Sequence, residues 1–163
     1  IYLRAALALA ALLLVLLDQG VKYLVLTKIP LGGHVPFLPH LLELTYVQNT
    51  GAAFSLFSEH TWLLTLVSLV MSVLLLAALV RGFFRHPFGR ISLALLLAGA
   101  VGNLIDRAFQ GYVVDMFHVL FMEFAVFNVA DICVVVGGIA AAVYYVWGYE
   151  RLEKGLHPQE RRP

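Results

Sequence analysis

The chain has 163 residues, of which 61% are hydrophobic and only 13% are charged. Soluble domains carry about 25% charged residues, so the composition excludes an ordinary soluble domain and predicts an integral membrane protein. The net charge of +1 gives no sign of nucleic-acid binding, and the single cysteine, Cys133, excludes an internal disulfide and a multi-cysteine metal site. The length suits one domain, which we assign to residues 1–150, followed by a tail of residues 151–163.

Four apolar segments are long enough to cross a bilayer, which takes about 20 mainly apolar residues in a helix. They cover residues 2–26, 63–80, 91–105 and 129–147. The first is not a cleaved signal peptide, because no small-residue cleavage site follows its apolar core before Lys22. The second begins after Trp62, an aromatic residue typical of membrane interfaces. The sequence therefore predicts an all-α polytopic membrane protein with four transmembrane helices.

The connection between the first two spans, residues 27–61, is too long for a plain loop. Prolines and glycines interrupt its beginning, between residues 30 and 39. Residues 42–48 then alternate partly between polar and apolar, as a strand does, and residues 49–51 read as a turn. We expect residues 52–57 to return as a second strand. The prediction is a small extracytoplasmic β-sheet, a cradle, within this connection.

Basic residues in the short connections predict the orientation in the membrane. The connection of residues 81–90 holds three arginines, and the tail holds four basic residues, at positions 151, 154, 161 and 162. The connection of residues 27–61 holds only Lys28, and the last connection is basic only at its boundary, Arg107. We therefore expect both termini in the cytoplasm and the unusual polar groups at the outer membrane face.

Two aspartates at this face are the strongest candidates for chemistry. Asp115 follows the third span in a loop that returns to the membrane, so we expect burial to raise its pKa. Asp131 lies in the first turn of the fourth span, with Asn128 as the N-cap, and the helix dipole favours its ionised form. One protonated and one ionised acid can activate a water molecule and protonate a leaving amine. Taken singly, each aspartate fits a structural role equally well.

Other polar residues near the same face have open roles. Asp18 and Lys22 are four residues apart, so they can pair on one helix face or contact a substrate. Arg107 can bind an anion, although bracing of the loop that carries Asp115 is the favoured interpretation. Three asparagines can bind a substrate backbone or orient the carboxyl groups: Asn49, Asn103 and Asn128.

Several common catalytic motifs are missing from the sequence. Neither a His-Glu-x-x-His zinc motif nor a Gly-x-Ser-x-Gly nucleophile motif occurs, and the six histidines are scattered. Asp115 and His118 together are only a weak metal signal. We therefore expect water, rather than a side chain, to be the nucleophile. Small residues of the third span suit close helix packing: Ala98, Gly99 and Gly102.

Five motifs occur in order along most of the chain: Asp18-Gln-Gly-Val-Lys22, Gln48-Asn-Thr-Gly-Ala-Ala-Phe54, Gly99-Ala-Val-Gly-Asn-Leu-Ile-Asp-Arg107, Gly111-Tyr-Val-Val-Asp115 and Phe127-Asn-Val-Ala-Asp131. Together they resemble the motifs of the bacterial lipoprotein signal peptidases (signal peptidase II). The resemblance implies that Asp115 and Asp131 are the catalytic dyad. It also implies roles in substrate binding or active-site structure for eight further residues: Asp18, Lys22, Asn49, Gly51, Asn103, Arg107, Asn128 and Ala130.

The resemblance further implies an aspartyl endopeptidase of the bacterial cytoplasmic (inner) membrane that needs no metal or other cofactor. Its expected substrate is a diacylglyceryl-modified prolipoprotein, whose signal peptide is removed at the outer membrane face. We also expect contact with membrane lipid, inhibition by cyclic peptides of the globomycin type, and a monomer. One departure is Met116, which stands where a large aromatic residue is common.

The main alternative is a proton- or ion-coupled small membrane transporter, because carboxyl groups in membranes also serve proton relays. Two features weigh against it. The polar residues gather at one membrane face, and the second span has no ionisable group along residues 63–80.

Overall fold

The computed structural model describes residues 2–51 and 61–153. Its elements, in chain order, are α1 (Tyr2–Lys28), β1 (His34–Leu38), β2 (Leu42–Asn49), α2 (Thr61–Arg81), α3 (Pro87–Gln110), β3 (Val113–Val119), α4 (Val129–Val143) and the π-helical segment η2 (Tyr144–Glu153). Within these residues, four helices are long and apolar enough to cross a membrane, and the fourth continues from α4 into η2. The predicted four-helix membrane protein is confirmed.

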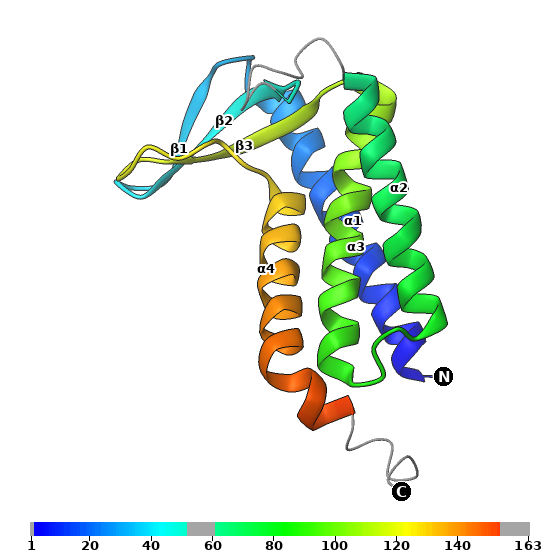
Figure 1. Ribbon diagram of the computed structural model, residues 1–163. Helices are drawn as coiled ribbons and strands as arrows, with labels where there is room; N and C mark the ends of the chain where they lie inside the picture. Colours follow the sequence, from blue (N-terminus) through cyan, green and yellow to red (C-terminus); the bar gives the residue numbers. More distant parts are fainter. Residues whose placement is uncertain (1, 52–60, 154–163) are drawn as a thin grey trace, which may run out of the picture.

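The helices run side by side, and the sheet stands at one end of the bundle (Figure 1). The start of α1 and the end of η2 lie at the opposite end, as an even number of crossings requires. Helix α3 packs against each of the other three helices. It buries nine residues, whereas α2 buries only Ser72. Polar groups on α3 can therefore be shared with its neighbours, away from lipid.

Helix α3 is longer than the predicted span of residues 91–105. It begins at Pro87, capped by His86, and ends where Gly111 adopts a φ of 78° and donates its N–H to the Arg107 carbonyl. The charged residue Asp106 suggested an earlier end. Because Asp106 is fully buried and paired, the helix continues through it to the glycine cap.

In the part of the chain that the structure describes, the sheet has three antiparallel strands in the order β1-β2-β3. The third strand comes from the connection between α3 and α4. The expectation of a sheet built only within residues 27–61 missed this strand. The predicted return strand, residues 52–57, lies outside the described residues. Strand β1 forms despite Pro36, because an edge strand tolerates proline, and the register shifts between Pro36 and Leu38.

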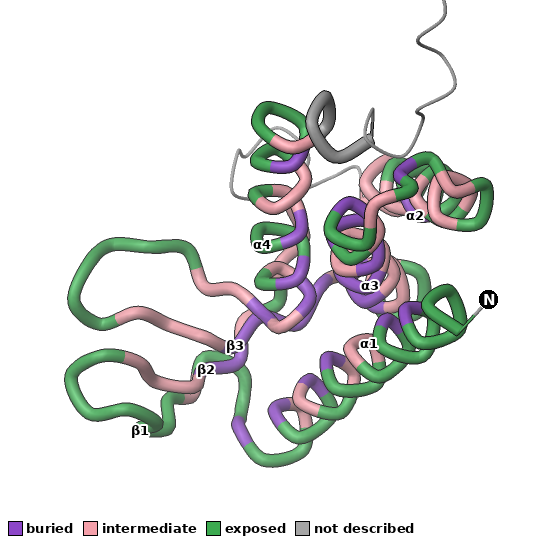
Figure 2. The backbone as a smooth tube through the Cα atoms, turned by 90° about the horizontal axis from the view of Figure 1, so that it is seen from below, coloured by how far each residue is buried: buried purple, intermediate pink, exposed green. Residues whose placement is uncertain are grey.

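Strand β3 joins the sheet to the bundle. Its first four residues, Val113–Met116, are buried, and the rest is half-buried (Figure 2). Val114 and Met116 pack with Val25 and Ile29 at the end of α1, together with Tyr46 of β2. Met116 is fully buried, so its flexible side chain fills this cluster in place of an aromatic ring. The cluster holds the sheet against the end of α1.

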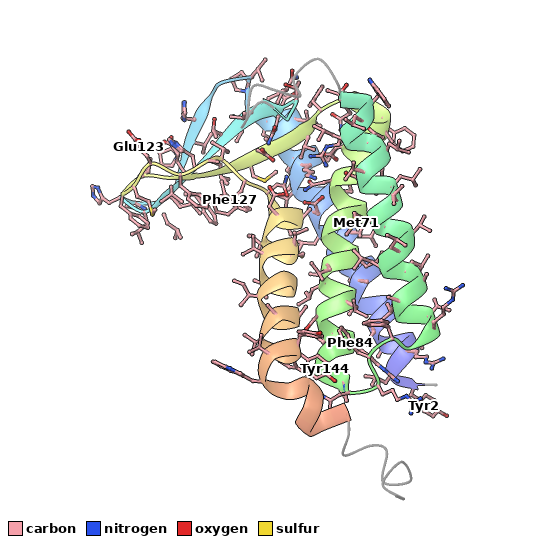
Figure 3. The ribbon with its side chains drawn as sticks, viewed as in Figure 1. Tyr2, Met71, Phe84, Glu123, Phe127 and Tyr144 are labelled. Atoms are coloured by element: carbon pink, nitrogen blue, oxygen red, sulfur yellow. The ribbon has the colours of Figure 1, made fainter. Side chains whose placement is uncertain are left out.

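A second apolar cluster holds the opposite end of the bundle. Phe84, Leu93 and Tyr144 pack together there, and the rings of Phe84 and Tyr144 meet edge to face at 5.0 Å (Figure 3). This contact ties the α2–α3 connection to the start of η2. The two apolar clusters thus stabilise opposite ends of the bundle.

Glycines let α3 and α4 approach closely, as the small residues predicted. A Cβ on Gly99 would meet the backbone carbonyl oxygen of Ala130 and come within 2.6 Å of Val134 Cγ2. A Cβ on Gly102 would lie 2.7 Å from Asp18 Oδ2 and 3.0 Å from Ala130 Cβ. The contact therefore depends on hydrogen atoms in place of side chains at both positions.

We predict that Gly99→Ala lowers the thermal unfolding midpoint in detergent, because overpacking typically costs about 1–3 kcal/mol. The matched control is Gly20→Ala on α1, where an added Cβ meets nothing within 4 Å. Alanine there should be neutral or stabilising. Equal midpoints for the two variants would contradict the close contact between α3 and α4.

Candidate active site

Asp115 lies on β3, opposite Val47 of β2, and its side chain is 2% exposed. It is therefore held by strand pairing rather than in a free loop. Both carboxyl oxygens accept side-chain amide hydrogens. Asn49 Nδ2 donates to Oδ2 at 2.9 Å, and Asn128 Nδ2 donates to Oδ1 at 2.7 Å. The carboxyl group has a fixed orientation.

Burial raises the pKa of Asp115 to about 6. The hydrogen bond from Asn49 lowers this pKa, while the negative charge of Asp131 raises it, and the bond from Asn128 lowers it again. The predicted upward shift is confirmed. Asp115 therefore keeps its proton up to a pH of about 6, close to the pH at which a general acid is effective.

Asp131 lies at the start of α4 and forms a capping box with Asn128, which confirms the predicted N-cap. Asn128 Oδ1 accepts the N–H of Asp131 at 2.8 Å, and Asp131 Oδ2 accepts the N–H of Asn128 at 3.1 Å. The other carboxyl oxygen, Oδ1, accepts from Asn103 Nδ2 at 2.7 Å. One oxygen of Asp131 therefore belongs to the helix cap and the other faces α3.

The orientation of each asparagine amide follows from its partners. Lys22 is only a donor, and its Nζ lies 3.1 Å from Asn103 Oδ1. The amide nitrogen of Asn103 must then face away from Lys22, toward Asp131. Likewise, because Asn128 Oδ1 accepts at the helix cap, its Nδ2 faces Asp115 and, at 3.1 Å, Asn103 Oδ1.

These bonds join the two aspartates through the two asparagines, in the order Asp115, Asn128, Asn103, Asp131. The four residues come from β3, α3 and the start of α4. Each amide donates to a carboxyl group, so the relay supports negative charge on either aspartate. Asn103, Asn128 and Asn49 all donate to a carboxyl group, as their predicted role in orienting these groups requires.

Lys22 anchors the relay from α1. Its Nζ lies 2.8 Å from Asp18 Oδ2, the predicted pair, and 2.9 Å from Asp106 Oδ2. All three side chains are at most 2% exposed. Gln19 Nε2 also donates to Asp106 Oδ1 at 2.9 Å. One cation is thus held between two carboxylates, and the same cation orients Asn103.

Asp106 and Gln19 were absent from the predicted site. A signal for Asp106 was available, because it follows Asn103 by three residues and so lies on the same face of α3. Asp106 Oδ2 accepts the N–H of Val114 at 3.0 Å, which fixes the strand next to Asp115. Asp106 thus braces the strand that carries Asp115, a role that we predicted for Arg107. Within the described residues, Arg107 Nη1 donates to Ser68 Oγ of α2 at 3.2 Å.

Gly51 and Ala130 act through their backbones. The Gly51 N–H donates to Asn49 Oδ1 at 2.8 Å, and this bond turns Asn49 Nδ2 toward Asp115. Gly51 has a φ of 89°, in the left-handed region that favours glycine. The Ala130 N–H donates to Asp18 Oδ1 at 2.8 Å, and its small side chain faces Gly102. Gly51 thereby orients Asn49, which donates to Asp115, and Ala130 fixes Asp18, which pairs with Lys22.

A cavity of about 440 Å³ opens beside Asp131. Its walls are mostly apolar and run from the segment before α4 down the helix: Asn49, Phe124, Ala125, Val126, Phe127, Asp131, Ile132, Val135 and Val136. Phe127 marks the place where this segment meets α4 (Figure 3). An apolar chain lying along α4 would bring its end to the carboxyl group of Asp131.

Residues 10–147 match the model of the family described as signal peptidase (SPase) II. The chain belongs to the signal peptidase II family. It is 40% identical to the lipoprotein signal peptidase of Enterococcus faecalis (strain ATCC 700802 / V583) over 143 residues, covering 88% of this chain and 89% of that protein. It is 43% identical to the lipoprotein signal peptidase of Streptococcus pneumoniae (strain ATCC BAA-255 / R6) over 136 residues, covering 83% and 89%.

Two solved structures described as bacterial membrane enzymes share the fold of this chain. One has a TM-score of 0.79 and 27% identity and covers 98% of this chain and 94% of that chain. The other has a TM-score of 0.81 and 28% identity and covers 88% and 94%. The resemblance found in the five motifs is confirmed, and the chain is a multi-pass membrane peptidase.

We predict that Lys22→Met strongly destabilises the protein, because removing one partner of a buried ion pair leaves uncompensated charge and costs about 3–5 kcal/mol. Thermal unfolding in detergent would measure the loss. Lys28→Met, at the exposed end of α1, is the matched control and should change the midpoint little.

Adding Asp18→Asn and Asp106→Asn to Lys22→Met removes the two stranded charges and should recover part of the lost stability. A Lys22→Met variant as stable as the Lys28→Met variant would show that the buried ions do not hold the site together.

Proposed function

We propose that the chain is an aspartyl endopeptidase that removes the signal peptide from diacylglyceryl-modified prolipoproteins, with Asp115 and Asp131 as the catalytic dyad. One observation carries the proposal: two aspartates from different elements are joined through Asn128 and Asn103 beside an apolar cavity. A pair of purely structural aspartates would need neither the shared relay nor the open cavity.

In hydrolysis, Asp131 would act as the general base and Asp115 as the general acid. Asp131, ionised, accepts one proton from a water molecule while the water oxygen bonds to the scissile carbonyl carbon. Asp115, protonated, donates its proton to the leaving nitrogen as the carbon–nitrogen bond breaks. The pair then carries its proton on Asp131 instead of Asp115, and transfer between the carboxyl groups restores the starting state. The raised pKa of Asp115 supports its assignment as the acid.

The substrate class rests on the relatives and the cavity together. The Enterococcus and Streptococcus relatives are named lipoprotein signal peptidases. The apolar wall from Phe127 to Val136 suits a signal helix or an acyl chain that stays in the membrane. A diacylglyceryl group would hold the scissile bond at this depth. Cyclic peptides of the globomycin type are proposed to bind the same cavity and compete with substrate.

We further propose that the sheet end of the bundle faces outward and both termini lie in the cytoplasm. The arginine-rich connection of residues 81–90 and the basic tail support this orientation. The connection between α2 and α3 and the end of η2 lie at the bundle end opposite the sheet (Figure 1). The dyad then sits at the outer face of the cytoplasmic membrane, where a lipid-modified substrate presents its cleavage site.

We predict that Asp115→Asn and Asp131→Asn each reduce cleavage of a diacylglyceryl-modified prolipoprotein at least about 100-fold, because acid–base catalysis is typically worth 10²–10⁴-fold. Purified variants in detergent, with unfolding midpoints measured alongside, would test this. Glu123→Gln removes an exposed acid near the tip of the sheet and is the control that should retain activity (Figure 3). Substantial cleavage by either folded dyad variant would refute the assignment.

The alkaline limb of the kcat/KM profile should have an apparent pKa near 6, because Asp115 loses its proton there. The hydrogen bond from Asn49 lowers the pKa of Asp115, so Asn49→Ala should move this limb to higher pH. Gln48→Ala removes the neighbouring exposed amide, which donates to Tyr46 instead, and should leave the limb in place. A limb that moves to lower pH in Asn49→Ala would contradict the role of Asp115.

A further inference from the structure

The sheet carries a cluster of two histidines and a glutamate that is separate from the proposed dyad. Each of the three strands contributes one residue: His34 from β1, Glu43 from β2 and His118 from β3. Glu43 pairs directly with His118, and His34 pairs with Thr45, two residues from Glu43. Because side chains alternate along a strand, His34, Glu43 and His118 share one face.

The three side chains converge on one point. His34 Nδ1 and His118 Nδ1 each lie 2.7 Å from the same oxygen, Glu43 Oε1. The histidine ring centroids are 6.2 Å apart, and candidate ligand atoms of all three residues lie within 4.8 Å of one another. The side chains remain accessible, at 55% exposure for His34, 36% for His118 and 19% for Glu43.

Glu43 is a carboxylate at this position, since the hydrogen bond with His118 lowers its pKa, as does the bond with His34. Two imidazole nitrogens and one carboxylate oxygen form a set that zinc and similar divalent transition metals prefer. Calcium and magnesium prefer oxygen ligands alone. In a tetrahedral zinc site with ligand distances of about 2.1 Å, ligand atoms lie about 3.4 Å apart. Small rotations of these accessible side chains would open the cluster from 2.7 Å to that spacing.

We propose that His34, Glu43 and His118 form a surface site for one zinc-class divalent ion, with water in the remaining coordination position. The ion would clip all three strands together on one face of the sheet. His118 lies three residues after Asp115, and β2, which carries Glu43, ends at Asn49. The clip would therefore stiffen the strands that hold Asp115 and Asn49, which donates to Asp115. It would not enter the hydrolytic steps, so the proposal does not depend on the proposed function.

The test is zinc binding by tag-free protein in detergent, measured by competition with a chromogenic zinc chelator. We expect one zinc ion per chain, and at least a tenfold loss of affinity in His34→Ala, Glu43→Gln and His118→Ala. His40→Asn is the matched control. It removes an exposed imidazole from the β1–β2 turn, and asparagine tolerates the φ of 63° there. This variant should bind zinc as the parent does.

Two further measurements test whether unfolding of a variant or non-specific binding of divalent ions could explain the zinc results. Zinc should raise the unfolding midpoint of the parent and of His40→Asn but not of His118→Ala, whose midpoint without zinc should match the parent. An excess of magnesium or calcium should leave zinc binding unchanged. The proposal is overturned if the parent shows no stoichiometric zinc binding, or if binding survives all three ligand substitutions.

Discussion

The buried ammonium group of Lys22 is the interaction on which the site depends. An isolated charge at this depth would be costly, yet Lys22 is 2% exposed and lies within 2.9 Å of two carboxylates, those of Asp18 and Asp106. Each partner then has a second task. Asp18 accepts from the backbone at the start of α4, and Asp106 accepts from the backbone of β3. Because Lys22 only donates, it also sets the amide orientation of Asn103. The ion cluster thus positions both elements that carry the proposed dyad, Asp115 and Asp131.

Close packing makes this geometry possible. The glycines of α3 bring the start of α4 within reach of Asp18, and the apolar cluster around Val114 and Met116 holds β3 on the end of α1. The proposed dyad therefore joins a residue of a strand with a residue of a helix capping box. The two carboxyl groups have different surroundings because they come from different elements. Asp115 is enclosed between two side-chain amides. Asp131 accepts hydrogen bonds from the helix cap and from Asn103, and it lies beside the cavity.

Local features were predictable from sequence, because their causes lie within a few residues. The four apolar spans, the Asn128 cap and the Asp18–Lys22 pair are of this kind. Features that join distant segments were not. Strand β3 pairs with a strand about 70 residues earlier, and neither strand alone shows its partner. Asp106 was taken as a helix end because its counter-ion lies on another helix. The cluster of His34, Glu43 and His118 was hidden for the same reason, since its members come from three strands.

The central claim is that Asp115 carries the proton of a coupled acid pair, and infrared titration of its carboxyl band measures this directly. The account predicts a protonated-carboxyl band that titrates near pH 6 in the parent and is absent in Asp115→Asn. Because the charge of Asp131 raises the pKa of Asp115, the band should titrate at lower pH in Asp131→Asn. A band that persists in Asp115→Asn, or that titrates at higher pH in Asp131→Asn, would contradict the account.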